Sequence, residues 1–122
     1  MANGDICIST GYNGDIVRAR KRAKEAKNGV VVRYVIPKEG SMLWITLLAI
    51  PRDASHAANA HLFINYMMTP QVMGDITNSV GFANAIPDAS PYLDSSVTAD
   101  SIVYPTPDER RRLIVPMEAP PR

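Results

Sequence analysis

An aromatic ring and a carboxylate lie three residues apart in the run Gly11-Tyr12-Asn13-Gly14-Asp15. The run separates an apolar β-type segment from a basic helical pattern, so we expect it at an exposed strand-to-helix corner, where open α/β folds hold ligands. A small organic cation would suit this corner, since Tyr12 offers cation–π attraction and Asp15 offers charge and hydrogen-bond acceptors. The structural alternative is that Asp15 only caps the helix and Tyr12 is half-buried.

Other residues that carry chemistry are isolated in the sequence. His56 and His61 lie five positions apart with no Cys or carboxylate partner at ligand spacing, so no metal site is expected. The sequence has no glycine-rich phosphate loop, zinc-binding Cys pair or nucleophile elbow. Cys7 lies in an apolar run and is expected to be a buried small hydrophobe. We therefore predict a protein without catalytic activity, metal or cofactor.

The composition is typical of one soluble globular domain. The chain has 122 residues, of which 46% are hydrophobic and 20% charged, and its net charge is +1. This charge gives no general attraction to nucleic acid or to an anionic membrane. Basic residues crowd positions 18–27 and 110–112, but no aromatic residue is interleaved with them, which favours solvated faces over a nucleic-acid surface.

The start of the chain lacks the pattern of a signal peptide. Residues 1–5 are polar, with neither a basic n-region nor an apolar h-region. The longest apolar stretch, residues 47–50, is far too short to span a bilayer. As written, the chain is expected to be cytoplasmic and not inserted in a membrane.

Hydrophobic periodicity predicts an α/β chain with about three strands and three helices. The first helix has a narrow apolar stripe, and the second has an apolar face made by Ala60, Phe63, Ile64 and Met67. Thr69-Pro70 is a helix-start pattern, with Thr as the N-cap and Pro in the first turn. The strands are expected at residues 5–10, 30–36 and 42–50, and the helices at 15–28, 54 or 55–68, and 70–78.

The character of the sequence changes after about residue 85. Seven of the ten prolines lie at or beyond position 87. We expect residues 1–85 to form the α/β part and residues 86–122 to form a Pro-rich C-terminal extension. This extension is predicted to be irregular and to lie on the surface, with a short helical turn at 108–113 and fraying beyond Pro116.

The order of several motifs resembles a known family. Together they closely resemble the C-terminal part of the putrescine-binding proteins of polyamine ABC importers, which are periplasmic solute-binding proteins. The resemblance implies a fragment of a two-lobed periplasmic-binding-protein fold, about a third of the full length, with a truncated end. The motifs follow one another at family-like spacing over residues 2–7, 11–15, 22–30, 36–40, 65–70 and 83–85.

The resemblance also implies a set of ligand-binding residues. The family's aromatic in the Gly-aromatic-x-Gly-Asp motif falls on Tyr12, and the aspartate that holds an ammonium group falls on Asp15. An aromatic wall residue falls on Trp44, and the aromatic before Ala-Asn-Ala falls on Phe82. The family's second ammonium-binding carboxylate falls on Thr46, which has no charge, so capture of a diamine should be weaker.

Two functions follow from this resemblance. The first is binding of a polyamine such as putrescine for ABC-type transport, with a periplasmic parent that docks on an ABC permease. In that case the isolated chain is expected to lack a complete site. The alternative is a structural or interaction remnant of the family without a transport role. In either case, unpaired strands predict a homo-oligomer formed by strand pairing or exchange.

Overall fold

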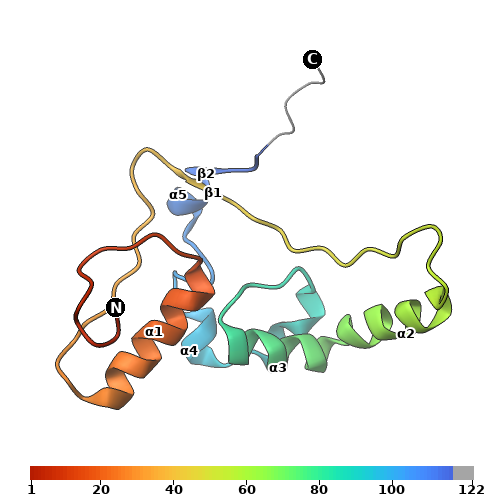
Figure 1. Ribbon diagram of the computed structural model, residues 1–122, viewed down its shortest axis with the longest axis horizontal. Coiled ribbons are helices and arrows are strands. Elements are labelled where there is room, and N and C mark those ends of the chain that lie inside the picture. Colours follow the sequence, from red (N-terminus) through yellow and green to blue (C-terminus); the bar gives the residue numbers. More distant parts are fainter. Residues whose placement is uncertain (117–122) are drawn as a thin grey trace.

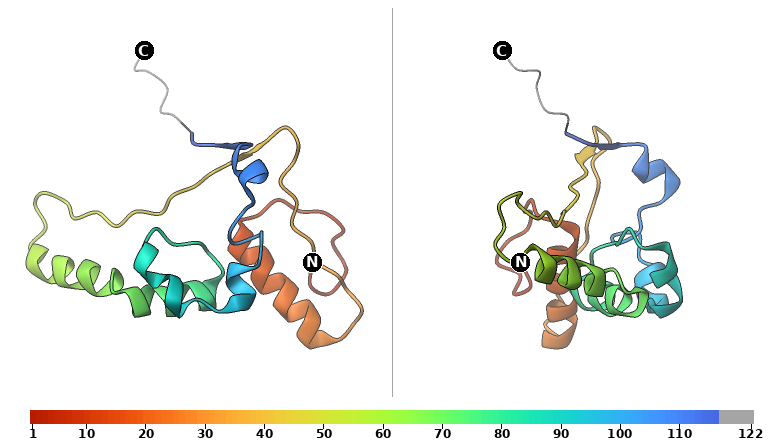
Figure 2. Two further views of the ribbon diagram at one scale, coloured as in Figure 1. Left: turned by 180° about the vertical axis from the view of Figure 1, so that it is seen from behind. Right: turned by 90° about the vertical axis from the view of Figure 1, so that its right-hand side faces the viewer.

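The computed structural model describes residues 1–116 and is mainly helical, with long extended connections. Figure 1 shows α1 near one end of the molecule and α2 at the other, with α3 between them. The views in Figure 2 show one extended connection running alone from β1 to the start of α2. In chain order the elements are α1 (Asn13–Ala26), β1 (Ser41–Met42), α2 (Ala57–Met67), α3 (Pro70–Val80), η1 (Pro87–Tyr92), α4 (Ser95–Thr98), α5 (Pro107–Arg110) and β2 (Leu113–Ile114).

Helix α1 forms the main buried cluster with the segment that follows it. Its side chains Ile16 and Ala23 are buried against Val32, and Ala19 packs beside them. The predicted apolar stripe is thus confirmed at these three helix positions, whereas Ala26 is exposed. The helix ends at Ala26 rather than at residue 28, because the next residue, a lysine, already has a left-handed backbone.

The prediction of three strands is wrong, because the predicted segments do not form hydrogen-bonded ladders of that length. Residues 5–10 and 30–36 have no strand pairing in the described part of the chain, and the third prediction, 42–50, shrinks to β1. β1 pairs in parallel with β2, Ser41 opposite Leu113. A strand exists only where a neighbour accepts and donates its hydrogen bonds, and β2 offers just two residues. Without a covering layer, Cys7 is exposed, which corrects its predicted burial.

Helices α2 and α3 occupy nearly the predicted positions. Helix α2 has no buried residue, so the predicted apolar face is at most partly covered, and Phe63 is more than half exposed. Helix α3 starts with Pro70 in its first turn, as predicted, but the Thr69 side chain makes no capping bond. It ends at Val80, two residues later than predicted, where Gly81 adopts the left-handed conformation that glycine tolerates.

The Pro-rich segment is more ordered than predicted. Between residues 87 and 114 it contains η1, α4, α5 and β2 rather than a single helical turn. Ala89 and Val103 are buried, and η1 packs along α3. The fraying predicted beyond Pro116 lies outside the described residues.

The Pro-rich segment is also bonded to α1. Arg20 forms a salt bridge with Asp100, and the Asn13 amide donates to the carbonyl oxygen of Ile102 at 2.9 Å. These bonds position the beginning of α1 against the turn that precedes α5. The corner that carries Tyr12 and Asp15 is therefore supported by residues from the last quarter of the chain.

Helix α5 begins with a reciprocal capping box. The Thr106 hydroxyl accepts from the Glu109 backbone N–H at 3.3 Å, and Glu109 Oε2 accepts from the Thr106 backbone N–H at 2.9 Å. These backbone and hydroxyl bonds, with the nearby Arg112 charge, hold the pKa of Glu109 below its ordinary value. The box fixes the turn that leads into β2.

Candidate functional site

The corner predicted from the sequence lies at the start of α1. Tyr12 occupies the N-cap position and Asp15 lies in the first turn, so the expectation that Asp15 caps the helix is wrong. Tyr12 is 56% exposed, and Asp15 is exposed as well. The position of Asp15 is favourable because the first turn of a helix attracts negative charge.

Asp15 already has a cationic neighbour. Its Oδ1 accepts a hydrogen bond from Arg18 Nη2 at 2.7 Å, one turn along the helix. Both side chains are about half exposed, so the pair is well hydrated and contributes little to stability. An incoming ammonium group would bind the remaining carboxylate lone pairs or displace the arginine.

Phe82 lies against the same corner. A Cβ placed on Gly14 would lie 2.5 Å from the Phe82 ring, so the ring rests directly on the helix backbone. Next to it, the missing side chain of Gly81 leaves room for Val17 of α1. Close approach at two glycines therefore brings Tyr12, Asp15 and Phe82 to one corner although they are up to 70 positions apart.

Trp44 and Thr46 lie on a different part of the chain. They belong to the extended segment 43–50, which leaves β1 and runs toward α2, away from α1 (Figures 1 and 2). Trp44 is 59% exposed, and Thr46 is exposed too. The structure therefore gathers three of the five predicted residues and leaves the other two on a separate segment.

A shallow basic hollow adjoins the corner. It has a volume of about 350 Å³, and Asp15, Arg18 and Arg22 contribute its charged walls beside Met1 and Ala2. The two guanidinium groups make this side of Asp15 unfavourable for a cation.

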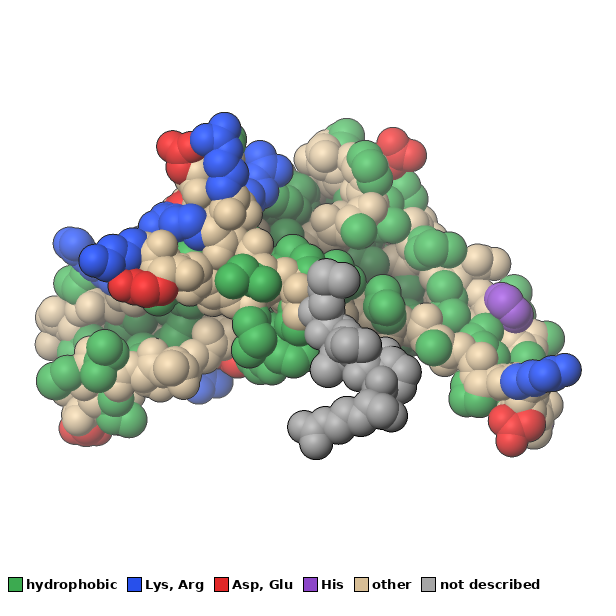
Figure 3. Space-filling view, turned by 90° about the horizontal axis from the view of Figure 1, so that it is seen from above, with side chains coloured by type: hydrophobic (Ala, Val, Ile, Leu, Met, Phe, Trp, Pro, Cys, Tyr) green, Lys and Arg blue, Asp and Glu red, His purple; other side chains and the backbone are tan. Residues whose placement is uncertain are grey.

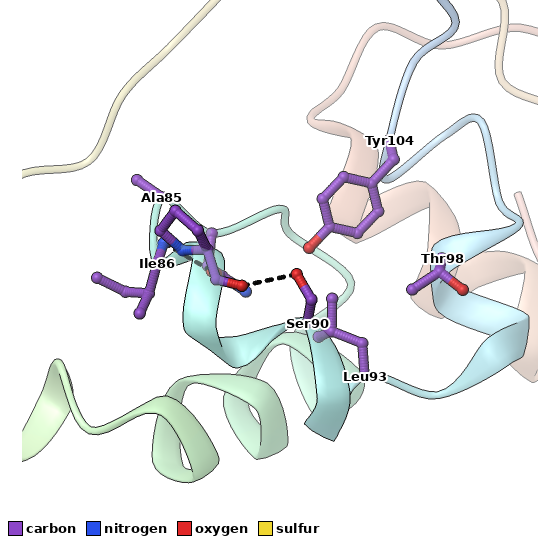
Figure 4. A pocket seen from close by; sticks show the side chains of 8 residues that line it. Ala85, Ile86, Ser90, Leu93, Thr98 and Tyr104 are labelled. Atoms are coloured by element: carbon purple, nitrogen blue, oxygen red, sulfur yellow. Dashed lines mark hydrogen bonds between the residues drawn. The ribbon is translucent and has the colours of Figure 1, made fainter.

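Sequence reasoning missed a second hollow, of about 430 Å³. Figure 4 shows the Tyr104 side chain reaching over it, with its hydroxyl directed toward Ser90. The Ser90 hydroxyl already donates to the Pro87 carbonyl oxygen at 2.7 Å, and the Asn84 amide bonds Thr77 at 2.9 Å. The Ser90 hydroxyl and the Asn84 amide that line this hollow thus already have hydrogen-bond partners within the protein. No sequence pattern predicts this hollow, because the residues that line it come from three short segments of the chain.

The described part of the chain gives no support for a metal-binding site. Within residues 1–116, no three His, Cys, Asp or Glu side chains gather closely enough to hold a metal ion. Over the same residues, no helix combines the length and apolar character needed to cross a bilayer.

Comparison with protein families shows the class to which this chain belongs. Residues 1–105 match the family described as bacterial extracellular solute-binding protein. The chain belongs to this family. Its mixture of helices and a small parallel sheet is a fragment of the periplasmic-binding-protein architecture.

Several curated relatives are similar over most of this chain. It is 42% identical to the putrescine-binding periplasmic protein SpuD of Pseudomonas aeruginosa over 93% of its length, and 43% identical to the putrescine-binding periplasmic protein PotF of Escherichia coli over the same share. It is 33% identical over 87% of its length to a spermidine/putrescine-binding periplasmic protein of Haemophilus influenzae. The match covers 31%, 30% and 28% of these relatives, so the chain spans about a third of their length.

Proposed function

We propose that this chain contributes to a solute-binding protein that captures a polyamine, or a similar small organic cation, for ABC-type import. The observation that carries the proposal is the packing of the Phe82 ring on Gly14, which brings a second aromatic side chain to the corner of Tyr12 and Asp15. Two rings beside one carboxylate suit a protonated amine. The names of the relatives, which are putrescine- and spermidine-binding proteins, support the same class of ligand.

In this proposal each predicted residue has a distinct role. Asp15 holds one ammonium group, while Tyr12 and Phe82 enclose the neighbouring methylene groups. Trp44 supplies a further wall and Thr46 a neutral hydrogen-bond acceptor once the segment 43–50 is placed beside the corner. Because Thr46 carries no charge, the second end of a diamine is held less strongly than the first.

The proposal extends to partners and location. The relatives are named periplasmic proteins, and we place this protein in the periplasm as well. Its partner there is the permease of an ABC importer. Binding involves no covalent chemistry, so no catalytic activity is expected.

The proposal can be tested in a chimera in which this chain replaces the matched third of SpuD. We expect saturable binding of putrescine in a calorimetric titration at low salt. The Asp15→Ala variant should lose about tenfold or more in affinity, because the ammonium group then lacks its charged acceptor. The control is Asp108→Ala, which removes an exposed aspartate that is likewise paired with an arginine three residues on, Arg111, and should leave the affinity unchanged. Equal affinities in both variants would remove Asp15 from the site.

A second candidate function is a self-associating structural module. It is favoured by one observation, the exposure of Trp44, Ile45 and Leu47 on the extended segment. This candidate predicts a dimer or larger assembly at micromolar concentration and no putrescine binding by the chimera. Light scattering on the isolated chain gives its mass directly.

A further inference from the structure

The carboxylate of the candidate site is already bound to a cation of the same chain. Arg18 Nη2 donates to Asp15 Oδ1 at 2.7 Å, and the two side chains are 53% and 52% exposed. A carboxylate offers about four lone-pair positions, so this single bond leaves room for another donor. Because the pair is open to solvent, dissolved cations compete with Arg18 for the carboxylate.

Arg22 adds a second positive charge to the same surroundings. It lies four residues beyond Arg18, on the same side of α1, and both guanidinium groups line the basic hollow together with Asp15. At a helical rise of about 1.5 Å per residue, Arg18 lies about 4.5 Å and Arg22 about 10.5 Å from Asp15 along the axis. The Debye length is about 10 Å at 0.1 M ionic strength, so both charges act on Asp15 at low salt.

The region around α1 is more positive than the chain as a whole. The chain has a net charge of +1, whereas α1 alone holds five basic and two acidic residues. On the face drawn in Figure 3, most Lys and Arg side chains lie in the left half, which holds α1 and α5 in Figure 1. Arg20 is paired with Asp100, but Arg18 and Arg22 lie beside Asp15. A cation that reaches Asp15 therefore meets a positive local potential.

We infer that Arg18 is a specificity-determining residue of the proposed corner, because it holds Asp15 before the ligand arrives and discriminates among amines by their charge. The inference rests on the proposed function, in which Asp15 binds an ammonium group. Replacement of the guanidinium by an ammonium group exchanges one charge-assisted hydrogen bond for another, and this exchange is the same for every amine. Coulomb repulsion from Arg18 acts on each positive charge of the ligand, so it grows with ligand charge.

The consequence is a corner that selects against highly charged amines. The monoamine butylamine meets the smallest repulsion, putrescine a larger one, and spermidine the largest. A cleft lined only by carboxylates has the opposite effect, since it attracts a cation more strongly as its charge rises. Arg18 therefore narrows the difference in affinity between monoamines and polyamines.

The test uses the chimera in which this chain replaces the matched third of SpuD. Butylamine, putrescine and spermidine are titrated by calorimetry into the unaltered chimera and into its Arg18→Gln variant. Arg18 is half exposed, and glutamine has a similar helix propensity, so the variant is expected to fold. At low salt the affinity should rise about threefold for butylamine and up to about tenfold for putrescine, with the largest gain for spermidine.

Two further variants separate the charge of Arg18 from its shape and position. Arg18→Lys keeps the charge without the planar guanidinium and should restore most of the discrimination. Lys24→Gln removes the same charge from the same helix, about 13.5 Å from Asp15 along the axis, and should give a smaller gain for every amine. At 1 M salt, where the Debye length is about 3 Å, the dependence of the gain on ligand charge should disappear.

The outcomes distinguish this inference from the proposed function. Equal affinities of the unaltered chimera and Arg18→Gln for all three amines overturn the inference and leave polyamine binding in place. A gain of the same factor for all three amines also overturns it, because the effect of Arg18 is then independent of ligand charge. Putrescine binding by Arg18→Gln alone confirms that Arg18 blocks Asp15. No binding by either protein overturns the proposed function and, with it, this inference.

Discussion

At the scale of single residues, the candidate site depends on two glycines, Gly14 and Gly81, which have no side chain. The Phe82 ring occupies the space that a Cβ of Gly14 would take, and Val17 occupies the space beside Gly81. Glycine lets a ring lie directly on a helix backbone, which fixes the distance between the ring and Asp15 in the same turn. The two glycines therefore allow the aromatic part of the site to lie close against α1.

The capping box of α5 gives a prediction for Glu109. We expect its pKa to lie below the ordinary glutamate value because the Thr106 backbone N–H and hydroxyl bond the charged form. The Thr106→Ala variant should move the pKa of Glu109 upward, whereas Thr106→Ser, which keeps the hydroxyl, should not. A pH titration of the side-chain carboxyl signals by NMR measures this.

The sign of the pH dependence follows from the lowered pKa. The charged Glu109 stabilises the folded α5 turn above the pKa of the unfolded chain, and this contribution is lost as pH falls through the folded pKa. The capping box at the start of α5 should therefore weaken as the pH falls through the pKa of Glu109. An identical Glu109 titration in the native and Thr106→Ala proteins would contradict the assigned cause.

At the scale of elements, the packing of η1 on α3 depends on Gly74. A Cβ there would lie 2.5 Å from the Cβ of Tyr92 and 3.2 Å from its carbonyl oxygen. Gly74→Ala gains about 1 kcal/mol of helix propensity but overpacks against the η1 backbone at a cost of about 1–3 kcal/mol. We expect net destabilisation in urea unfolding followed by circular dichroism.

A control variant on the same helix separates propensity from packing. Ser79 is exposed on α3, so Ser79→Ala should change the free energy of unfolding by no more than about 0.5 kcal/mol. If Gly74→Ala proved more stable than the native chain, η1 would have to lie farther from α3 than the structure places it.

The helices could be predicted from the sequence because their signals are local. The stripe of Ile16, Ala19 and Ala23 and the Pro70 start each depend on residues within one or two turns, whereas the end of α3 at Val80 was predicted two residues too early. The strands could not be predicted in the same way. The β-branched run at 30–36 favours extended backbone, but a ladder needs a second strand, which the described residues do not provide.

The candidate site shows the same division between local and distant signals. Tyr12 and Asp15 are three residues apart and could be placed on one corner from the sequence. Phe82 was linked to them only by resemblance, and its contact with Gly14 depends on tertiary packing of α3 on α1. Trp44 and Thr46 remain predictions as site residues, because a strand that lacks its neighbours does not carry its side chains to the corner.

At the scale of the whole molecule, the single tryptophan reports on the extended segment 43–50. Trp44 is 59% exposed, so acrylamide should quench its fluorescence in the isolated chain almost as well as that of N-acetyl-tryptophanamide. Poor quenching in the isolated chain that does not change on dilution would show that Trp44 is already covered.

The bonds between α1 and the Pro-rich segment have a consequence for synthesis. Asn13 and Arg20 reach their partners Ile102 and Asp100 across sequence separations of 89 and 80 residues. A ribosome makes the first helix long before it makes the residues that hold that helix in place, and β1 gains its neighbour only when residue 114 has emerged. Helix α1 therefore stays without these partners until residues 100–114 have been made, so its folding waits for the Pro-rich segment.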